Sequence, residues 1–158
     1  MFTNIVWATD GSENADRALD YATAIADREH SHLHVVHIVE MLVGGRVAGQ
    51  KVFLNEDQID AKIKEQARQA SAEHGLQATV RITSSGTGSI AKRVAEIAAD
   101  NSADLIVVGT RGHSALGGLM LGSVTQRLLH VAGCPVLAIP PVKAHADVSP
   151  QPSAVTAS

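Results

Sequence analysis

The stretch LIVVGTRGHSALGGLMLGSVT, residues 105–125, decides the fold class. It begins with an unbroken apolar run rich in Ile and Val, which is typical of a strand buried on both faces of a parallel sheet. Gly109 and Gly112 follow where that strand should end, at the edge where open α/β sheets bind ligands. Gly122 and Ser123 then precede a helical pattern, whose first backbone N–H groups would face an anion. Together these features predict a site for a nucleoside phosphate.

The spacing of the glycines strengthens this prediction. The pattern is Gly109-x2-Gly112-x9-Gly122-Ser123, which sets two glycine turns at a fixed distance. Glycine lacks Cβ, so it lets phosphate oxygens approach the backbone. The alternative is that the first pair only turns the chain and the second pair only caps a helix, which is the commoner use of each alone. The presence of both pairs after one buried strand favours the phosphate site.

Composition restricts the class of protein. The 158 residues favour one domain with a real core. Hydrophobic residues make up 45% of the chain, yet aromatic residues make up only 3%, which argues against the stacking platforms of single-stranded nucleic-acid binding. A formal net charge of −3 removes the electrostatic basis for binding duplex DNA or an anionic membrane.

Targeting signals and cysteine usage point to the cytoplasm. No apolar run approaches the roughly 20 residues of a membrane span, and Ile5 already belongs to an expected core strand, so we expect no signal peptide. Cys134 is the single cysteine, which excludes an internal disulfide and suits a reducing compartment. We therefore expect a cytoplasmic protein.

Strands and helices are predicted to alternate along the chain. Ser12 is a candidate N-cap for the first helix, Asn55 for the second, and Gly75 ends the second. Strict alternation implies a parallel sheet with right-handed crossovers, and the alternating pattern of 78–83 is typical of an edge strand. Residues 41–54 are expected to form a loop, 1–142 one domain, and 143–158 a disordered tail. Strands are expected over 4–9, 33–39, 78–83, 104–108 and 135–139, and helices over segments that include 15–26, 59–70, 90–98 and about 123–132.

The chain resembles the universal stress proteins that bind ATP. These proteins share the pattern G-x2-G-x9-G-(S/T), which this sequence matches without a gap, and the resemblance covers about residues 2–140. It also includes the opening strand with Ala8-Thr9-Asp10, the pair His37-Ile38, and Cys134-Pro135-Val136-Leu137. The resemblance implies a five-stranded parallel sheet in the order 3-2-1-4-5 with helices on both faces, as in adenine nucleotide alpha hydrolase-like folds, and usually a homodimer.

The resemblance also implies roles for individual residues. Residues at the ends of the first, second and fourth strands would line the pocket and meet adenine and ribose, and the two glycine turns would hold the phosphates. Asp10 is the side chain expected to touch ribose or Mg²⁺, because hard oxygen ligands suit Mg²⁺; its alternative role is a turn or cap beside Gly11. His113 follows the phosphate glycine, where it is either an added donor or a solvated loop residue. The expected nucleotide-binding residues are Ala8, Thr9, Asp10, Ile38, Val108, Gly109, Gly112, His113, Gly122, Ser123, Val124 and Thr125.

Other chemistries are disfavoured by the sequence. It lacks G-x4-G-K-(S/T), and no G-x-G-x-x-G follows the first strand, so neither a P-loop ATPase nor a nicotinamide cofactor is expected. The histidines at positions 30, 32, 34 and 37 lie close in sequence, but no cysteine or carboxylate pair completes a recognisable metal set. Trp7 is predicted to be core and Cys134 an inert packed thiol. Arg111, Lys92 and Arg93 are interpreted as solvated charges.

The sequence therefore predicts an ATP-binding regulator of the stress response, in which Mg²⁺ accompanies the nucleotide and hydrolysis is slow or absent. Phosphoryl transfer needs a positioned nucleophile, a metal and a charge clamp, and no Lys or Arg stands at an evident phosphate-loop position. Two alternatives stay open. One is a nucleotide-independent dimeric interaction protein of the same fold, and the other is a binder of AMP or a cyclic nucleotide. An enzyme of the ATP-pyrophosphatase type would need a Ser-Gly-Gly-rich loop after the first strand, where this chain has Asp10-Gly11-Ser12.

Overall fold

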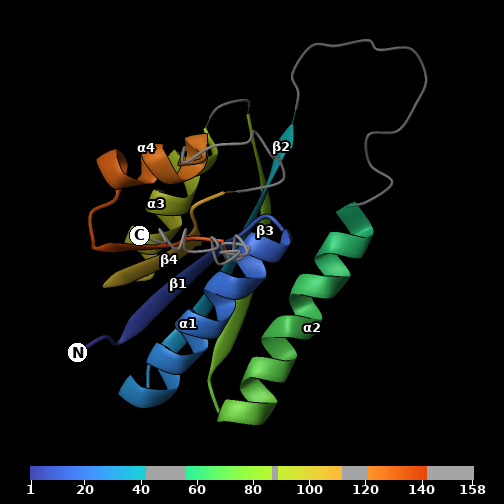
Figure 1. Cartoon of the computed structure of the whole chain (residues 1–158), viewed down its shortest axis with the longest axis vertical. Helices are drawn as coiled ribbons and strands as arrows, with labels where there is room; N and C mark the ends of the chain where they lie inside the picture. Colours follow the sequence, from blue (N-terminus) through green and yellow to red (C-terminus); the bar gives the residue numbers. More distant parts are fainter. Residues whose placement is uncertain (42–55, 87–88, 112–120, 142–158) are drawn as a thin grey trace, which may run out of the picture.

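The computed structural model describes residues 1–41, 56–86, 89–111 and 121–141. Within them a five-stranded parallel sheet has the order β3-β2-β1-β4-β5, and helices cover both of its faces (Figure 1). The predicted fold class and strand order are confirmed. The elements in chain order are β1 (Asn4–Thr9), α1 (Glu13–Glu29), β2 (His32–Met41), α2 (Glu56–His74), β3 (Ala78–Gly86), α3 (Ile90–Asp100), β4 (Leu105–Gly109), α4 (Ser123–Val131) and β5 (Val136–Ile139).

The main departure from the expected boundaries lies in β2 and β3. β2 starts at His32 and runs to Met41, and β3 continues past Thr83 to Gly86. These two strands pair with each other as far as Met41 and Gly86, whereas β1 pairs with β2 only as far as His37. Ser84 and Ser85 hide the extension in the sequence because serine is not enriched in strands. β3 lies at an edge of the sheet, as predicted.

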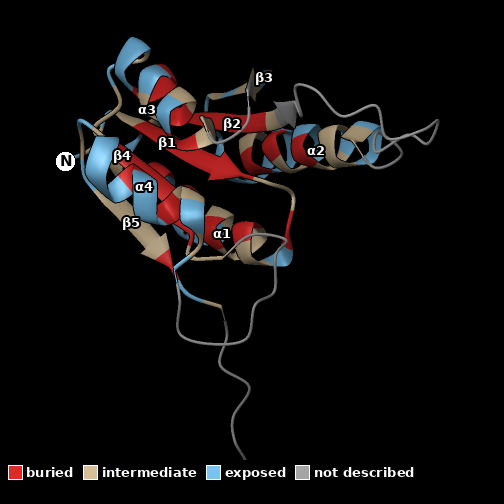
Figure 2. Ribbon diagram, turned by 90° about the horizontal axis from the view of Figure 1, so that it is seen from above, coloured by how far each residue is buried: buried red, intermediate tan, exposed pale blue. Residues whose placement is uncertain are grey.

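The core consists of two layers, one on each face of the sheet (Figure 2). Successive residues of a strand point to opposite faces. On β1, Ile5 and Trp7 pack in the cluster that contains residues of α1 and α2, whereas Val6 and Ala8 pack in the cluster with α3 and α4. Trp7 is fully buried, as expected, and its indole Nε1 donates to the carbonyl of Ala15 at 3.0 Å.

Helix termini follow the capping signals where the structure describes them. The Ser12 side chain accepts from the backbone N–H of Ala15 at 3.3 Å and caps α1. α2 ends before Gly75, whose φ of +65° suits glycine. No helix in the described ranges has the length and hydropathy that crossing a membrane requires. The predicted loop over 41–54 is wrong at Met41, which belongs to β2. Its other residues, the cap at Asn55 and the tail over 143–158 lie outside the described residues.

Candidate functional site

A cavity of about 420 Å³ opens at the carboxyl ends of β1 and β4. In the order 3-2-1-4-5 this is the position where the chain switches direction across the sheet, which is where open α/β folds bind ligands. β2 and α3 contribute apolar side chains, whereas polar groups come from the end of β1 and the first turns of α4. The lining residues are Ala8, Thr9, Asp10, Ala15, Val36, Ile38, Ile90, Ala91, Val94, Val108, Gly109, Arg111, Gly122, Ser123, Val124, Thr125 and Arg127.

The structure brings the predicted nucleotide-binding residues together. Each of those in the described ranges lines this cavity, although they come from four separate parts of the chain: Ala8, Thr9, Asp10, Ile38, Val108, Gly109, Gly122, Ser123, Val124 and Thr125. Gly112 and His113 lie outside the described residues. Asp10 and Gly109, which are 99 positions apart in the sequence, line the same cavity.

The N-terminus of α4 differs from that of α1 in a way that favours an anion. α1 is capped by the Ser12 side chain and carries Glu13 and Asp16 in its first turn. These carboxylates already balance the partial positive charge at its N-terminus. α4 starts after Gly122, which makes no side-chain cap hydrogen bond, and its first turn holds no acidic residue. Its first N–H groups and the helix dipole therefore favour a ligand anion beside the cavity.

Two hydrogen bonds fix α4 against the end of β4. The Gly122 N–H donates to the carbonyl of Thr110 at 2.7 Å, so this amide is already used within the protein. The Thr125 hydroxyl donates to the carbonyl of Gly109 at 2.8 Å and is buried. Among the described residues, the N–H groups of the first turn from Ser123 onward are the candidate anion donors, and their position depends on Thr125.

We expect Thr125→Val to loosen this attachment, because valine keeps the shape of threonine but cannot donate to the Gly109 carbonyl. A lost buried hydrogen bond costs about 1–2 kcal/mol, so the free energy of unfolding should fall by about that amount in urea titrations. Thr125→Ser is the matched control, since it retains the hydroxyl. Equal stability of the valine variant and the wild-type protein would show that the hydrogen bond does not hold α4 in place.

Two arginines at the cavity correct the sequence interpretation. Arg111, interpreted from the sequence as a solvated charge, is half-buried and lines the cavity. Arg127, on the second turn of α4, also lines the cavity. The sequence interpretation assigned no Lys or Arg to a phosphate-loop position, whereas both of these arginines line the cavity. Arg127 lies four residues after Ser123, so the two residues lie on the same side of α4, about one helical turn apart. That i, i+4 spacing was a signal available in the sequence. Lys92 and Arg93 instead pair with Glu96 on the surface of α3.

Asp10 has a local role in the turn that follows β1. Its Oδ1 accepts from the backbone N–H of Ser12 at 3.0 Å, and the Thr9 hydroxyl accepts from the N–H of Gly11 at 3.1 Å. Gly11 has a φ of +78°, which few side chains tolerate. The turn role weighed for Asp10 is therefore present, and its carboxylate also lines the cavity.

The single cysteine has the environment of an unreactive thiol. Cys134 is half-buried and packs against the core cluster beneath α3 and α4. Burial raises the pKa of its thiol above the ordinary value, and the charge of Asp104 raises it further. A raised pKa lowers the thiolate fraction, and the thiolate is the nucleophile. This agrees with the prediction of an inert packed thiol.

Comparison with known proteins places the chain in a family. The model of the universal stress protein family matches residues 1–140. The chain belongs to the universal stress protein family. It is 33% identical over 150 residues to the universal stress protein YxiE of Bacillus subtilis, covering 88% of this chain and 99% of that protein.

Solved structures of relatives show the same fold. A protein from the universal stress protein family of Burkholderia pseudomallei matches with a TM-score of 0.64 and 28% identity, over 88% of this chain and 96% of that one. A universal stress protein from Archaeoglobus fulgidus, solved in complex with dAMP, matches with a TM-score of 0.58 and 25% identity. That match covers 88% of this chain and 98% of the Archaeoglobus chain.

Proposed function

We propose that this universal stress protein binds ATP in the cavity between β1 and β4 and acts in the stress response through the bound state. The observation that carries the proposal is the N-terminus of α4, where the N-cap Gly122 makes no side-chain cap hydrogen bond and which lies beside an apolar cavity at the switch point of the sheet. The apolar side chains of Ile38, Val94 and Val108 would contact the base. The first turn of α4 would receive the phosphates.

Positive charge around the cavity supports a ligand with several phosphates. Arg111 and Arg127 line the cavity in addition to the helix N-terminus. Arginine suits phosphate because its planar guanidinium presents several donors at once. The relative from Archaeoglobus fulgidus binds dAMP, which supports an adenine nucleotide in general. AMP and cyclic nucleotides therefore stay as alternatives, and the arginines favour the longer phosphate chain.

The residues at the cavity are compatible with a nucleotide-bound Mg²⁺. The donor set that Mg²⁺ prefers is oxygen, and it is often held by one carboxylate together with phosphates. Asp10 supplies a carboxylate at the edge of the cavity. In the proposed complex Asp10 would hold the ion, and the ion would offset phosphate charge.

Slow or absent hydrolysis is part of the proposal. Rapid phosphoryl transfer needs a group that positions the attacking water in addition to a charge clamp. The arginines supply charge, but the one candidate base among the lining residues in the described ranges is Asp10, which this proposal assigns to Mg²⁺. We expect phosphate release far below the roughly 1 s⁻¹ at the lower end of typical turnover.

Calorimetric titration of nucleotide-free protein tests the proposed ligand. ATP with Mg²⁺ should bind at one site per chain, more tightly than AMP or cyclic AMP, and GTP should bind more weakly than ATP. Asp10→Asn should weaken ATP binding only when Mg²⁺ is present. Absence of binding by every nucleotide at millimolar concentration would favour the nucleotide-independent interaction protein.

We also propose that two copies of the chain associate through β5, whose Val136–Ile139 segment forms an edge of the sheet. The carbonyls of Pro135 and Ile139 accept from β4, so the N–H of the intervening Ala138 faces the open edge. An unpaired edge is a template for another strand. Sedimentation should show a dimer at micromolar concentration and a monomer for Ala138→Pro. A wild-type monomer under these conditions would contradict the proposed dimer.

A further inference from the structure

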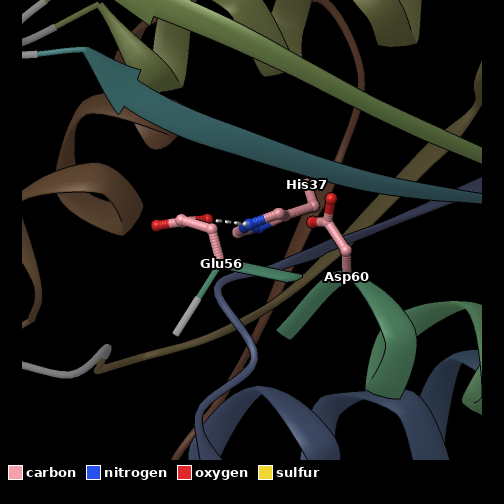
Figure 3. A group of neighbouring side chains, drawn as sticks. All are labelled: His37, Glu56 and Asp60. Carbon is pink, nitrogen blue, oxygen red and sulfur yellow. Dashed lines mark ion pairs between the residues drawn. The ribbon is translucent and has the colours of Figure 1, made fainter. Parts of the chain in front are cut away.

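A second group of side chains lies on the opposite face of the sheet from the nucleotide cavity. His37 on β2 and Glu56 and Asp60 on α2 point toward one another (Figure 3). One potential ligand atom from each residue lies within 4.8 Å of the other two. Ile38, the next residue of β2, points into the nucleotide cavity, so the two sites are separated by the sheet.

The imidazole of His37 is buried, oriented and incompletely bonded. The residue is only 5% exposed, and its Nδ1 lies 2.9 Å from the backbone carbonyl of Thr9. A carbonyl can only accept, so Nδ1 must carry the proton and donate it. In the neutral ring Nε2 then presents a lone pair, and no described residue forms a hydrogen bond with Nε2. This is the arrangement in which a backbone carbonyl orients a metal-binding histidine.

The carboxylates facing this lone pair are also incompletely bonded. Glu56 Oε2 lies 3.6 Å from His37 Nε2, and neither Glu56 Oε2 nor Asp60 Oδ1 has a hydrogen-bond partner among the described residues. Burying such oxygens unpaired costs free energy. Lys62, two residues after Asp60, does not neutralise them, because it bonds Asp16 and the carbonyl of Gly11.

A lone pair and two carboxylates that face one another would be stabilised by a positive charge between them. A proton on Nε2 would satisfy one carboxylate, but 3.6 Å exceeds the about 2.7–3.2 Å of an N–H···O bond and leaves the second oxygen unmatched. Two ligands of a tetrahedral Zn²⁺, at roughly 2.0–2.2 Å from the ion, lie about 3.4 Å apart. The 3.6 Å between His37 Nε2 and Glu56 Oε2 is therefore close to the separation of two ligands on one metal ion.

We propose that His37, Glu56 and Asp60 form a site for a divalent transition metal, of which Zn²⁺ is the best match. One imidazole nitrogen and two carboxylate oxygens are ligands that Zn²⁺ accepts, and a fourth position would be held by water. The ion would join β2 to the first turns of α2. This site is distinct from the Mg²⁺ proposed at Asp10, and it does not depend on nucleotide binding.

The sequence interpretation missed this site for a definable reason. It considered His37 with its neighbours in sequence and found no carboxylate pair, whereas the carboxylates come from a helix that begins 19 residues later. His32 and His34 do share a strand face, because β2 begins at His32, and their rings stack with centroids 4.3 Å apart. They are the other two histidines of β2, so they supply a control for where Zn²⁺ binds.

Zn²⁺ titration of the nucleotide-free full chain by calorimetry tests the proposal, with Co²⁺ absorption as a second readout of coordination. We expect one ion per chain. Glu56→Gln and Asp60→Asn should each weaken Zn²⁺ binding at least tenfold, and His37→Asn should abolish it while keeping a donor near the Thr9 carbonyl. His32→Asn and Asp10→Asn are controls that should bind Zn²⁺ as the wild-type chain does.

Circular dichroism should show that each variant folds, and thermal unfolding of the wild-type chain should shift upward with Zn²⁺ because a ligand of the folded state stabilises it. The Glu56→Gln variant should lack most of this shift. The proposal is overturned if Zn²⁺ fails to bind at one equivalent. It is equally overturned if binding survives His37→Asn and disappears in His32→Asn, which would assign the ion to the stacked histidines.

Discussion

Gly122→Val is expected to weaken ATP binding at least tenfold, about 1.4 kcal/mol. Gly122 precedes α4 with φ −60° and ψ 151°, an extended conformation that valine adopts readily, so the backbone should keep its shape. The branched side chain would instead occupy space beside the first N–H groups of α4, where the proposed phosphates approach. The effect should therefore fall on the ligand and not on the fold.

A weaker ATP affinity could arise from lost phosphate contacts or from a changed fold. Adenosine distinguishes these explanations, since it carries the base and ribose without phosphates. Its affinity should change little in Gly122→Val if the substitution acts at the phosphate end. Gly133→Val is the matched control, because Gly133 is exposed and a Cβ there would have nothing within 4 Å. Equal ATP affinity in the Gly122 variant and the wild-type chain would remove the phosphate assignment at this turn.

Gly109→Ala should destabilise the protein by about 1–3 kcal/mol, the usual cost of inserting a methyl group into a packed interior. A Cβ at Gly109 would lie 2.9 Å from the carbonyl oxygen of Asn14 and 3.1 Å from its carbonyl carbon. These are backbone atoms of the first turn of α1, so they can move only if the helix moves. The end of β4 and the start of α1 both border the cavity, so ATP affinity should fall as well.

Urea unfolding measures this change, and Gly133→Ala provides the reference. An exposed alanine in place of glycine is expected to leave stability unchanged or raise it by about 0.4–1 kcal/mol, because the unfolded chain loses conformational freedom. Gly109→Ala should therefore be less stable than the wild-type chain, whereas Gly133→Ala should not be. If Gly109→Ala is as stable as Gly133→Ala, the close approach of β4 to α1 does not constrain position 109.

Much of the fold can be predicted from the sequence because each strand or helix signal depends on residues that are neighbours in the chain. The apolar run at 105–108 and the cap at Ser12 each depend on neighbouring residues, and the structure has both as expected. The extension of β3 through Ser84 and Ser85 was not predictable in this way, since it depends on pairing with β2. Strand length there is decided by the partner strand.

The candidate sites likewise divide into residues that a local pattern predicts and residues that only the packing of the chain brings together. The glycine pattern and the family resemblance point to the residues that surround the cavity, because both glycine turns are set by spacing along one segment. Arg127 was missed because its spacing from Ser123 shows only that both residues lie on one side of the helix, and that side faces the cavity only once the helix is positioned. The cluster at His37 was missed because Glu56 and Asp60 reach it only through the packing of α2 against the sheet.

The most direct test of the central claim is to map ATP with Mg²⁺ onto the protein by amide chemical shifts. The account predicts that the largest shifts fall at the ends of β1 and β4 and in the first turn of α4, at Thr9, Gly109, Ser123 and Val124, and that residues of β3 and the far end of α2 stay unchanged. Saturating ATP that leaves the amides of Gly109 and Ser123 unshifted, or that shifts another face of the molecule instead, would contradict the account.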